Sequence, residues 1–178
     1  MLRLFYIFIM IGNIIKNVAN LIPIAIRIFK ELKIRKMSKE LKKFKVSNSF
    51  TFTIEDSLEQ VCNAPEGGAG IFVVYAVEGD AKELIMVAST GTVQNDGTLK
   101  SKNGGLYDKI VNGHQFAKTG RKYSWPAQMK LESIDALEVV WYETFNADVK
   151  AIPTAVEGQV LQSFLDENAK LPRWNVAF

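Results

Sequence analysis

Apolar residues between positions 46 and 145 occur in short runs that are typical of β-strands. Residues 46–54 (VSNSFTFTI) alternate and are rich in β-branched side chains, which predicts a strand. Residues 71–77 and 83–88 are apolar runs separated by Glu-Gly-Asp, which predicts a hairpin. Residues 136–145 alternate around an apolar centre and predict the strand that follows.

Helical spacing of apolar residues occurs between and after these runs. Residues 153–168 begin with proline and place apolar side chains three to four positions apart, which predicts a helix. Residues 106–115 and 123–132 predict short helices, residues 55–62 a short helix or turn, and residues 89–105 a polar loop. The element order predicts an α+β fold, a small antiparallel three-stranded sheet flanked by helices.

The chain before this domain has a different character. Residues 1–45 are apolar and then basic, so we expect an N-terminal extension followed by a domain at residues 46–178. Residues 4–28 are long enough to span or contact a membrane, although Lys16 and Pro23 interrupt them.

Three interpretations of the extension stay open. It is an inner-membrane anchor with a cytoplasmic domain behind it, a soluble helical appendage of a cytoplasmic protein, or a stretch upstream of a start at Met37. Mass spectrometry of the native N-terminus distinguishes the third from the others, because only the first two yield a peptide from residues 1–36.

Charge is divided unevenly along the chain. Residues 1–45 hold 11 Lys or Arg against 2 Glu, a net of +9, whereas residues 46–178 hold 11 against 17 acids, a net of −6, which together give +3. A DNA-binding surface needs a basic footprint, so an acidic domain must concentrate its cations locally. The cations around the first predicted helix are the candidate DNA contacts, although a solvated loop face explains them equally well: Lys100, Lys102, Lys118, Arg121 and Lys122.

Candidate metal chemistry is narrow. One cysteine and one histidine exclude a disulfide framework and argue against structural zinc, so a metal would be held by oxygen ligands. The glycine-rich segment 64–70 (APEGGAG) lacks the Lys-Ser/Thr ending of a phosphate-binding loop, which favours a flexible connection.

Five short motifs occur in a fixed order from residue 70 onward. They are Gly70-Ile71-Phe72, Met86-Val87-Ala88-Ser89, residues 104–114 (GGLYDKIVNGH), an isolated Glu157, and residues 171–175 (LPRWN). Together they cover about 110 residues and resemble the GIY-YIG nuclease superfamily. The resemblance implies hydrolysis of a DNA phosphodiester with one Mg²⁺ or Mn²⁺ ion.

The resemblance also implies roles for individual residues. Phe72 and Met86 stand where the family has two tyrosines, and Lys109 stands where it has an arginine that stabilises developing negative charge. Glu157 corresponds to the metal-holding acid, and Asn175 to a residue that supports the site. Phe72 and Met86 have no hydroxyl, and Lys109 keeps the charge but loses the planar fork of arginine.

These replacements lead to three hypotheses. Because loss of one such group costs about 10²–10³-fold in rate, the first is an impaired or inactive nuclease-like protein that keeps a DNA- or partner-binding role. The second is an active nuclease with a rearranged site made of Lys109, His114 and Glu157. The third is a non-enzymatic protein-interaction module. Glu157 lies among apolar neighbours, so we expect a metal ion or Lys109 as its partner.

Overall fold

A computed structural model describes residues 41–100 and 104–177, together with Leu21. The chain divides into two compact units, Met1–Lys36 and Met37–Phe178, and only the second is described in detail. The predicted membrane segment 4–28, Leu21 apart, and the candidate DNA contact Lys102 lie outside the described residues. Within those described residues, the structure contains no helix with the length and apolar character needed to cross a membrane.

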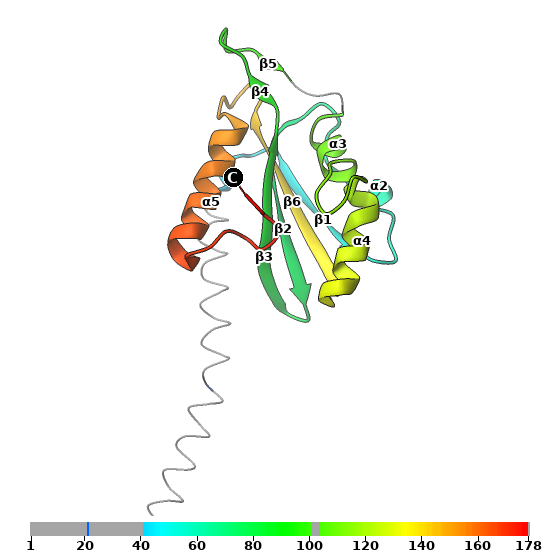
Figure 1. The fold of residues 1–178 in the computed structure, drawn as a ribbon. Coiled ribbons are helices and arrows are strands. Elements are labelled where there is room, and N and C mark those ends of the chain that lie inside the picture. Colours follow the sequence, from blue (N-terminus) through cyan, green and yellow to red (C-terminus); the bar gives the residue numbers. More distant parts are fainter. Residues whose placement is uncertain (1–20, 22–40, 101–103, 178) are drawn as a thin grey trace, which may run out of the picture. The chain divides into compact units, whose positions relative to one another are not determined.

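The second unit is built on an antiparallel sheet of four strands (Figure 1). In spatial order they are β1 (Ser47–Thr53), β6 (Ala136–Phe145), β2 (Ala69–Glu78) and β3 (Ala81–Thr90). The α+β class is therefore confirmed, whereas the prediction of three strands is wrong.

The fourth strand is β1, which pairs with β6 at the edge of the sheet. Phe50 lies opposite Val139 and Phe52 opposite Leu137. Both phenylalanines are buried in the main hydrophobic core, and burial of two large aromatic side chains stabilises the added strand. Leu41 and Phe44 are also buried, so packing begins before the predicted boundary at residue 46.

The remaining elements are helices and one small hairpin. The segment predicted as a polar loop contains β4 (Thr92–Val93) and β5 (Leu99–Lys100), which pair with each other outside the main sheet. The helices are α2 (Leu58–Val61), α3 (Gly105–Val111), α4 (Arg121–Glu132) and α5 (Pro153–Asn168).

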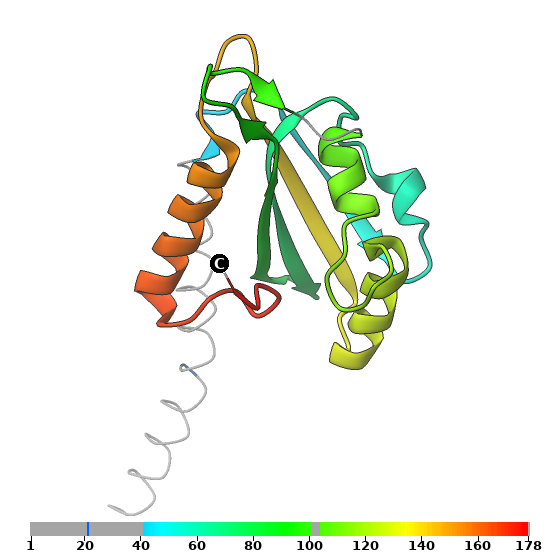
Figure 2. The same ribbon diagram turned by 45° about the horizontal axis from the view of Figure 1, so that its top comes forward.

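The helices form layers on both faces of the sheet. Figures 1 and 2 show α5 on one face and α2, α3 and α4 on the other. Because side chains alternate along a strand, Phe72 and Val74 belong to the core beneath α3 and α4, while Ile71 and Val73 are buried on the face of α5.

The glycine-rich connection between α2 and β2 packs against the start of α3. The carbonyl of Gly68 accepts a hydrogen bond from the N–H of Leu106 at 3.0 Å, and the carbonyl of Pro65 accepts one from Tyr107 at 3.2 Å. A Cβ on Gly105 would lie 2.6 Å from the carbonyl oxygen of Glu66, so this approach requires glycine. The loop therefore satisfies the first N–H groups of α3, which a phosphate loop would leave for its ligand.

Candidate functional site

Two side chains meet at the end of β3, and the charge of a third acts on one of them. Ser89 on β3 donates a hydrogen bond from its hydroxyl to the Oε2 atom of Glu157 on α5. Burial raises the pKa of Glu157, while this hydrogen bond and the positive charge of Lys109 on α3 act in the opposite direction. Lys109 and Glu157, separated by 48 positions in the sequence, therefore lie close enough to interact electrostatically.

These residues offer few ligands for a metal ion. Within the described part of the chain, no group of three or more His, Cys, Asp or Glu side chains lies together. Glu157 and the Ser89 hydroxyl provide two kinds of oxygen ligand. This set fits a Mg²⁺-type ion that takes its other ligands from water, since such ions are commonly held by one or two carboxylates.

Phe72 and Met86 lie on the face of the sheet that α3 and α4 cover, opposite to Ser89 and Glu157. Both belong to the core beneath α3 and α4, with exposed fractions of 0% and 4%. The guanidinium carbon of Arg121 lies 5.5 Å from the centre of the Phe72 ring. The two positions that the resemblance assigns to tyrosines are thus filled by core side chains and do not contact Glu157.

Arg121 has a structural position within the core. Its exposed fraction is only 3%, and burial lowers its pKa to about 10. Its Nη1 donates to the carbonyl of Lys109, and its Nε donates to Oε1 of Gln115 at 3.1 Å. The same Gln115 oxygen accepts a hydrogen bond from Trp125 at 3.0 Å, so one amide joins two buried groups.

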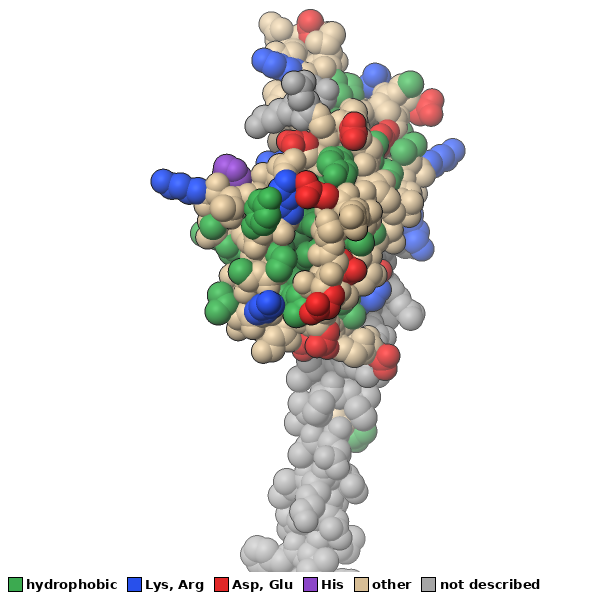
Figure 3. Space-filling model, turned by 90° about the vertical axis from the view of Figure 1, so that its right-hand side faces the viewer, with side chains coloured by type: hydrophobic (Ala, Val, Ile, Leu, Met, Phe, Trp, Pro, Cys, Tyr) green, Lys and Arg blue, Asp and Glu red, His purple; other side chains and the backbone are tan. Residues whose placement is uncertain are grey.

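Few of the predicted DNA contacts remain as exposed cations. Arg121 is buried, and Lys122 forms an ion pair with Glu59 at 2.7 Å. Lys100 and Lys118 are exposed. On the face that carries α2, α3 and α4, Figure 3 shows cations interspersed with acids and apolar side chains among the described residues, without a continuous positive surface.

Asn175 closes the free edge of β3. Its Oδ1 accepts from the N–H of Val87 at 2.9 Å, and its Nδ2 donates to the carbonyl of Val87 at 2.8 Å. The N–H of the preceding Trp174 donates to the carbonyl of Ile85 at 2.8 Å. The carboxamide of Asn175 therefore takes the place of a strand residue.

The rest of the LPRWN motif fixes this segment to the fold. Arg173 forms ion pairs with Glu83 at 2.8 Å and Glu132 at 2.7 Å, and the Trp174 indole donates to Glu132 at 2.7 Å. Gln115 donates to the carbonyl of Trp174 at 2.9 Å. The motif is a C-terminal clasp, and we use this name for residues 171–175.

His114 lies on the loop after α3, where it is exposed. Its backbone forms an isolated antiparallel bridge with Gly120. In the described part of the chain, the side-chain hydrogen bond of Glu157 goes to Ser89 and not to His114. The structure thus brings together two of the three residues of the rearranged-site hypothesis.

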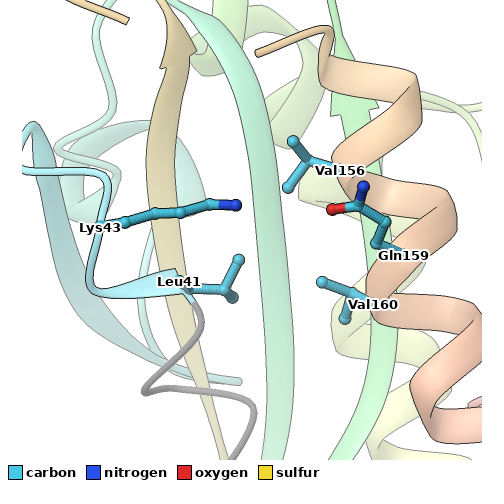
Figure 4. Close-up of a pocket in the computed structure, with 5 residues that line it drawn as sticks. All are labelled: Leu41, Lys43, Val156, Gln159 and Val160. Atoms are coloured by element: carbon cyan, nitrogen blue, oxygen red, sulfur yellow. The ribbon is translucent and has the colours of Figure 1, made fainter.

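A separate cavity of about 190 Å³ lies between the segment before β1 and α5. Its lining residues, shown in Figure 4, are Leu41, Lys43, Val156, Gln159 and Val160. Figure 4 shows the Lys43 side chain extending toward α5. None of the predicted site residues lines it.

The Ser89–Lys109–Glu157 cluster and the clasp are the features that distinguish this α+β unit. Compared with protein-family models, with curated proteins and with solved structures, the chain matches none. Ser89 is the site residue that sequence reasoning missed. It was quoted as the last residue of the second motif but received no role, and its signal was a polar side chain at the end of an apolar strand.

Proposed function

We propose that residues 46–178 form a GIY-YIG-like domain that binds nucleic acid and has lost most or all phosphodiester hydrolysis. The observation that carries the proposal is the hydrogen bond between Ser89 and Glu157, whose carboxyl also experiences the positive charge of Lys109. The order of motifs along the chain assigned Lys109 and Glu157 to one site, although their helices, α3 and α5, lie on opposite faces of the sheet.

The charged residues would act on a phosphate group. The Lys109 ammonium offers a positive charge to a phosphate oxygen. A Mg²⁺ or Mn²⁺ ion, held by Glu157 with the Ser89 hydroxyl beside it, would supply further stabilisation of negative charge when bound. Glu157 is half-buried, and burial raises its pKa, so a cation beside it would favour its ionised form.

Impairment follows from the groups that are missing. Phe72 and Met86 have no hydroxyl and lie away from Glu157, so they cannot move a proton at the cluster. Each missing acid–base or charge-stabilising group costs about 10²–10³-fold in rate, although such losses do not simply multiply. We therefore expect binding to persist while cleavage is slight.

Two assays test this proposal. Fluorescence anisotropy with labelled DNA in EDTA should show binding that Lys109→Met weakens several-fold, while Lys130→Met, a change of an exposed lysine on α4, leaves it unchanged. Plasmid nicking with Mg²⁺ or Mn²⁺ should stay near the background level. The proposed loss of activity would be wrong if the wild type nicked plasmid robustly, Glu157→Gln abolished the nicking and the exposed control Glu78→Gln did not. The proposed binding role would be wrong if the protein did not bind DNA.

Two alternatives have an observation in their favour. Proximity of Lys109 and Glu157 also suits an active nuclease with a rearranged site, which requires His114→Ala to abolish nicking. The net charge of −6 over residues 46–178 suits a non-enzymatic module that binds a protein. That module would show no salt-dependent DNA binding.

A further inference from the structure

The outer face of α4 carries a row of side chains that the described part of the chain leaves exposed. Tyr123 and Leu131 are 65% and 81% exposed, and Ala127 between them is exposed as well. Their spacing of four residues places all three on one side of the helix, along about 12 Å, and we call this row the α4 stripe. The opposite side of α4 buries Trp125 and Met129 in the core. An apolar row of this kind on a helix that is already packed indicates a contact surface.

The described C-terminal end of the chain leads away from the α4 stripe. Arg173 forms an ion pair with Glu132 in the last turn of α4, and two residues later Asn175 binds Val87 on β3. Figures 1 and 2 show this end of the chain on the side of α5, whereas α4 lies on the other face of the sheet. The clasp therefore fixes the end of α4 without covering the stripe.

The α4 stripe is symmetric about its central residue. Tyr123 lies four residues before Ala127, and Leu131 lies four residues after it. When a second α4 packs antiparallel with the two Ala127 side chains opposite each other, each Tyr123 faces the partner's Leu131. The small alanine at the crossing point lets the two helices approach closely, and the larger side chains fill the space on either side. The stripe is thus complementary to a second copy of itself.

Charge favours the antiparallel arrangement over the parallel one. Residues 109–131 contain no acid, whereas Glu132 and Asp135 follow directly. Lys118 before the first turn of α4 and Asp135 after its last turn are both exposed. Antiparallel packing brings Lys118 toward the partner's Asp135, and it opposes the positive end of one helix dipole to the negative end of the other. Parallel packing would bring like charges together.

We infer that two copies of this chain associate through α4, packed antiparallel about a two-fold axis at Ala127. Since α4 has 12 residues and is about 18 Å long, one helix pair buries less surface than a permanent dimer does. The association is therefore weak and depends on protein concentration. It involves neither Ser89 nor Glu157, so it goes beyond the proposed nucleic-acid binding and does not require it.

Two substitutions on the stripe test which residues face each other. Tyr123→Lys places an ammonium against the partner's Leu131, and Leu131→Glu places a carboxylate against the partner's Tyr123. Each variant alone should associate at least tenfold more weakly than the wild type, which should dimerise at about 0.1–1 mM. An equimolar mixture of the two variants should dimerise again, because its heterodimer has one lysine–glutamate contact and one unchanged tyrosine–leucine contact.

Sedimentation equilibrium of the full chain measures these samples, with Glu78→Lys in the exposed turn between β2 and β3 as the control that keeps wild-type association. A monomeric wild type, single variants that dimerise as the wild type does, or a mixture that stays monomeric would each refute the proposed contact. Restored association in the mixture supports it, because that result depends on position 123 meeting position 131.

Cross-linking gives a second readout, which does not depend on association through other parts of the chain. The native Cys62 is buried, and burial raises its pKa to about 11, so it reacts slowly. Ala127→Cys places one thiol from each copy beside the two-fold axis, and a short bismaleimide should join two chains. Glu78→Cys, which is also exposed, should not be joined.

The cross-linking result also distinguishes other occupants of the α4 stripe. An introduced thiol at position 127 that reacts with a simple maleimide but forms no cross-link would show an open surface without a second copy. A thiol that does not react would show that another segment or molecule covers this surface. Either result would refute the dimer.

Discussion

The side chain of Asn175 hydrogen-bonds to both backbone groups of Val87, 88 positions earlier in the chain. A residue that the family resemblance assigned to support of a catalytic site therefore completes the edge of a sheet. The two roles do not conflict, because Val87 lies two positions from Ser89 and the clasp ends beside the candidate site.

Replacing Asn175 should destabilise the domain. Asn175→Asp keeps an acceptor for the N–H of Val87 but turns a carboxylate oxygen toward its carbonyl, so we expect a loss of about 2 kcal/mol or more in the free energy of unfolding, and about 1–2 kcal/mol for Asn175→Ala. Urea denaturation measures both. The exposed Asn95→Ala should change stability by less than about 0.5 kcal/mol. An Asn175→Asp variant as stable as wild type would contradict the pairing.

The burial of Glu157 should make stability depend on pH. The folded-state pKa is raised above the usual 4.5, so the folded protein binds the proton more tightly than the unfolded chain. Stability contributed by the protonated form is therefore lost as pH rises from about 4.5 through the raised folded pKa. Relative to Glu157→Gln, the wild type should lose stability across that range. Parallel curves for the two proteins, from urea denaturation at each pH, would exclude this contribution.

The two partners of Glu157 should have unequal effects on its pKa. The hydrogen bond from Ser89 lowers the pKa more than the charge of Lys109 does. Both Ser89→Ala and Lys109→Met should therefore raise the pKa of Glu157, Ser89→Ala by the larger amount. Titration of the Glu157 carboxyl carbon by NMR measures this, with Lys118→Met as an exposed control. A lowered pKa in either variant would show that the partner is misassigned.

Two glycines in neighbouring segments should respond differently to alanine. A Cβ on Gly70 would lie 1.9 Å from the carbonyl oxygen of Tyr142, whereas a Cβ on Gly67 would meet nothing within 4 Å. We expect Gly70→Ala to cost roughly 3 kcal/mol, and Gly67→Ala to be neutral or slightly stabilising. Thermal unfolding of the pair provides the comparison. Equal melting temperatures would show that β6 can move away from β2.

The buried Arg121 should not tolerate lysine. Lysine cannot reproduce both donations, to the carbonyl of Lys109 and to Gln115, or the contact with Phe72. We expect Arg121→Lys to cost about 2–4 kcal/mol in stability by urea denaturation, while Lys118→Arg on the exposed loop is neutral. If DNA affinity per folded molecule fell with stability unchanged, Arg121 would instead be a phosphate contact.

Local sequence patterns predicted those helices and strands in which the spacing of apolar residues matches the face that is buried. The strand at residues 136–145 and the helix at residues 153–168 have the predicted bounds, because each repeats apolar side chains on the face that packs. The hairpin of β4 and β5 was missed because strands of two residues contain no period. Strand β1 was predicted, but its partner lies about 90 positions away, and no local pattern specifies a pairing at that separation.

The candidate site was predictable only in part for the same reason. The order of the motifs predicted one site for Lys109 and Glu157, and in the structure the charge of Lys109 acts on the pKa of Glu157. Phe72 and Met86 lie on the face that α3 and α4 cover. The alternation of side chains along a strand does not reveal which helices cover each face of the sheet. Arg121 was read as a DNA contact because a basic segment is usually exposed, and its aromatic and carbonyl partners come from distant positions.

The clasp has a consequence for the order of events during synthesis. The edge of β3 is completed by Trp174 and Asn175, which leave the ribosome after every other element of the domain. The middle of the sheet likewise waits for β6, which separates β1 from β2. Such long-range closures slow folding and leave strand edges exposed in the meantime. Nascent chains should therefore remain sensitive to protease until residues 171–175 have emerged from the exit tunnel.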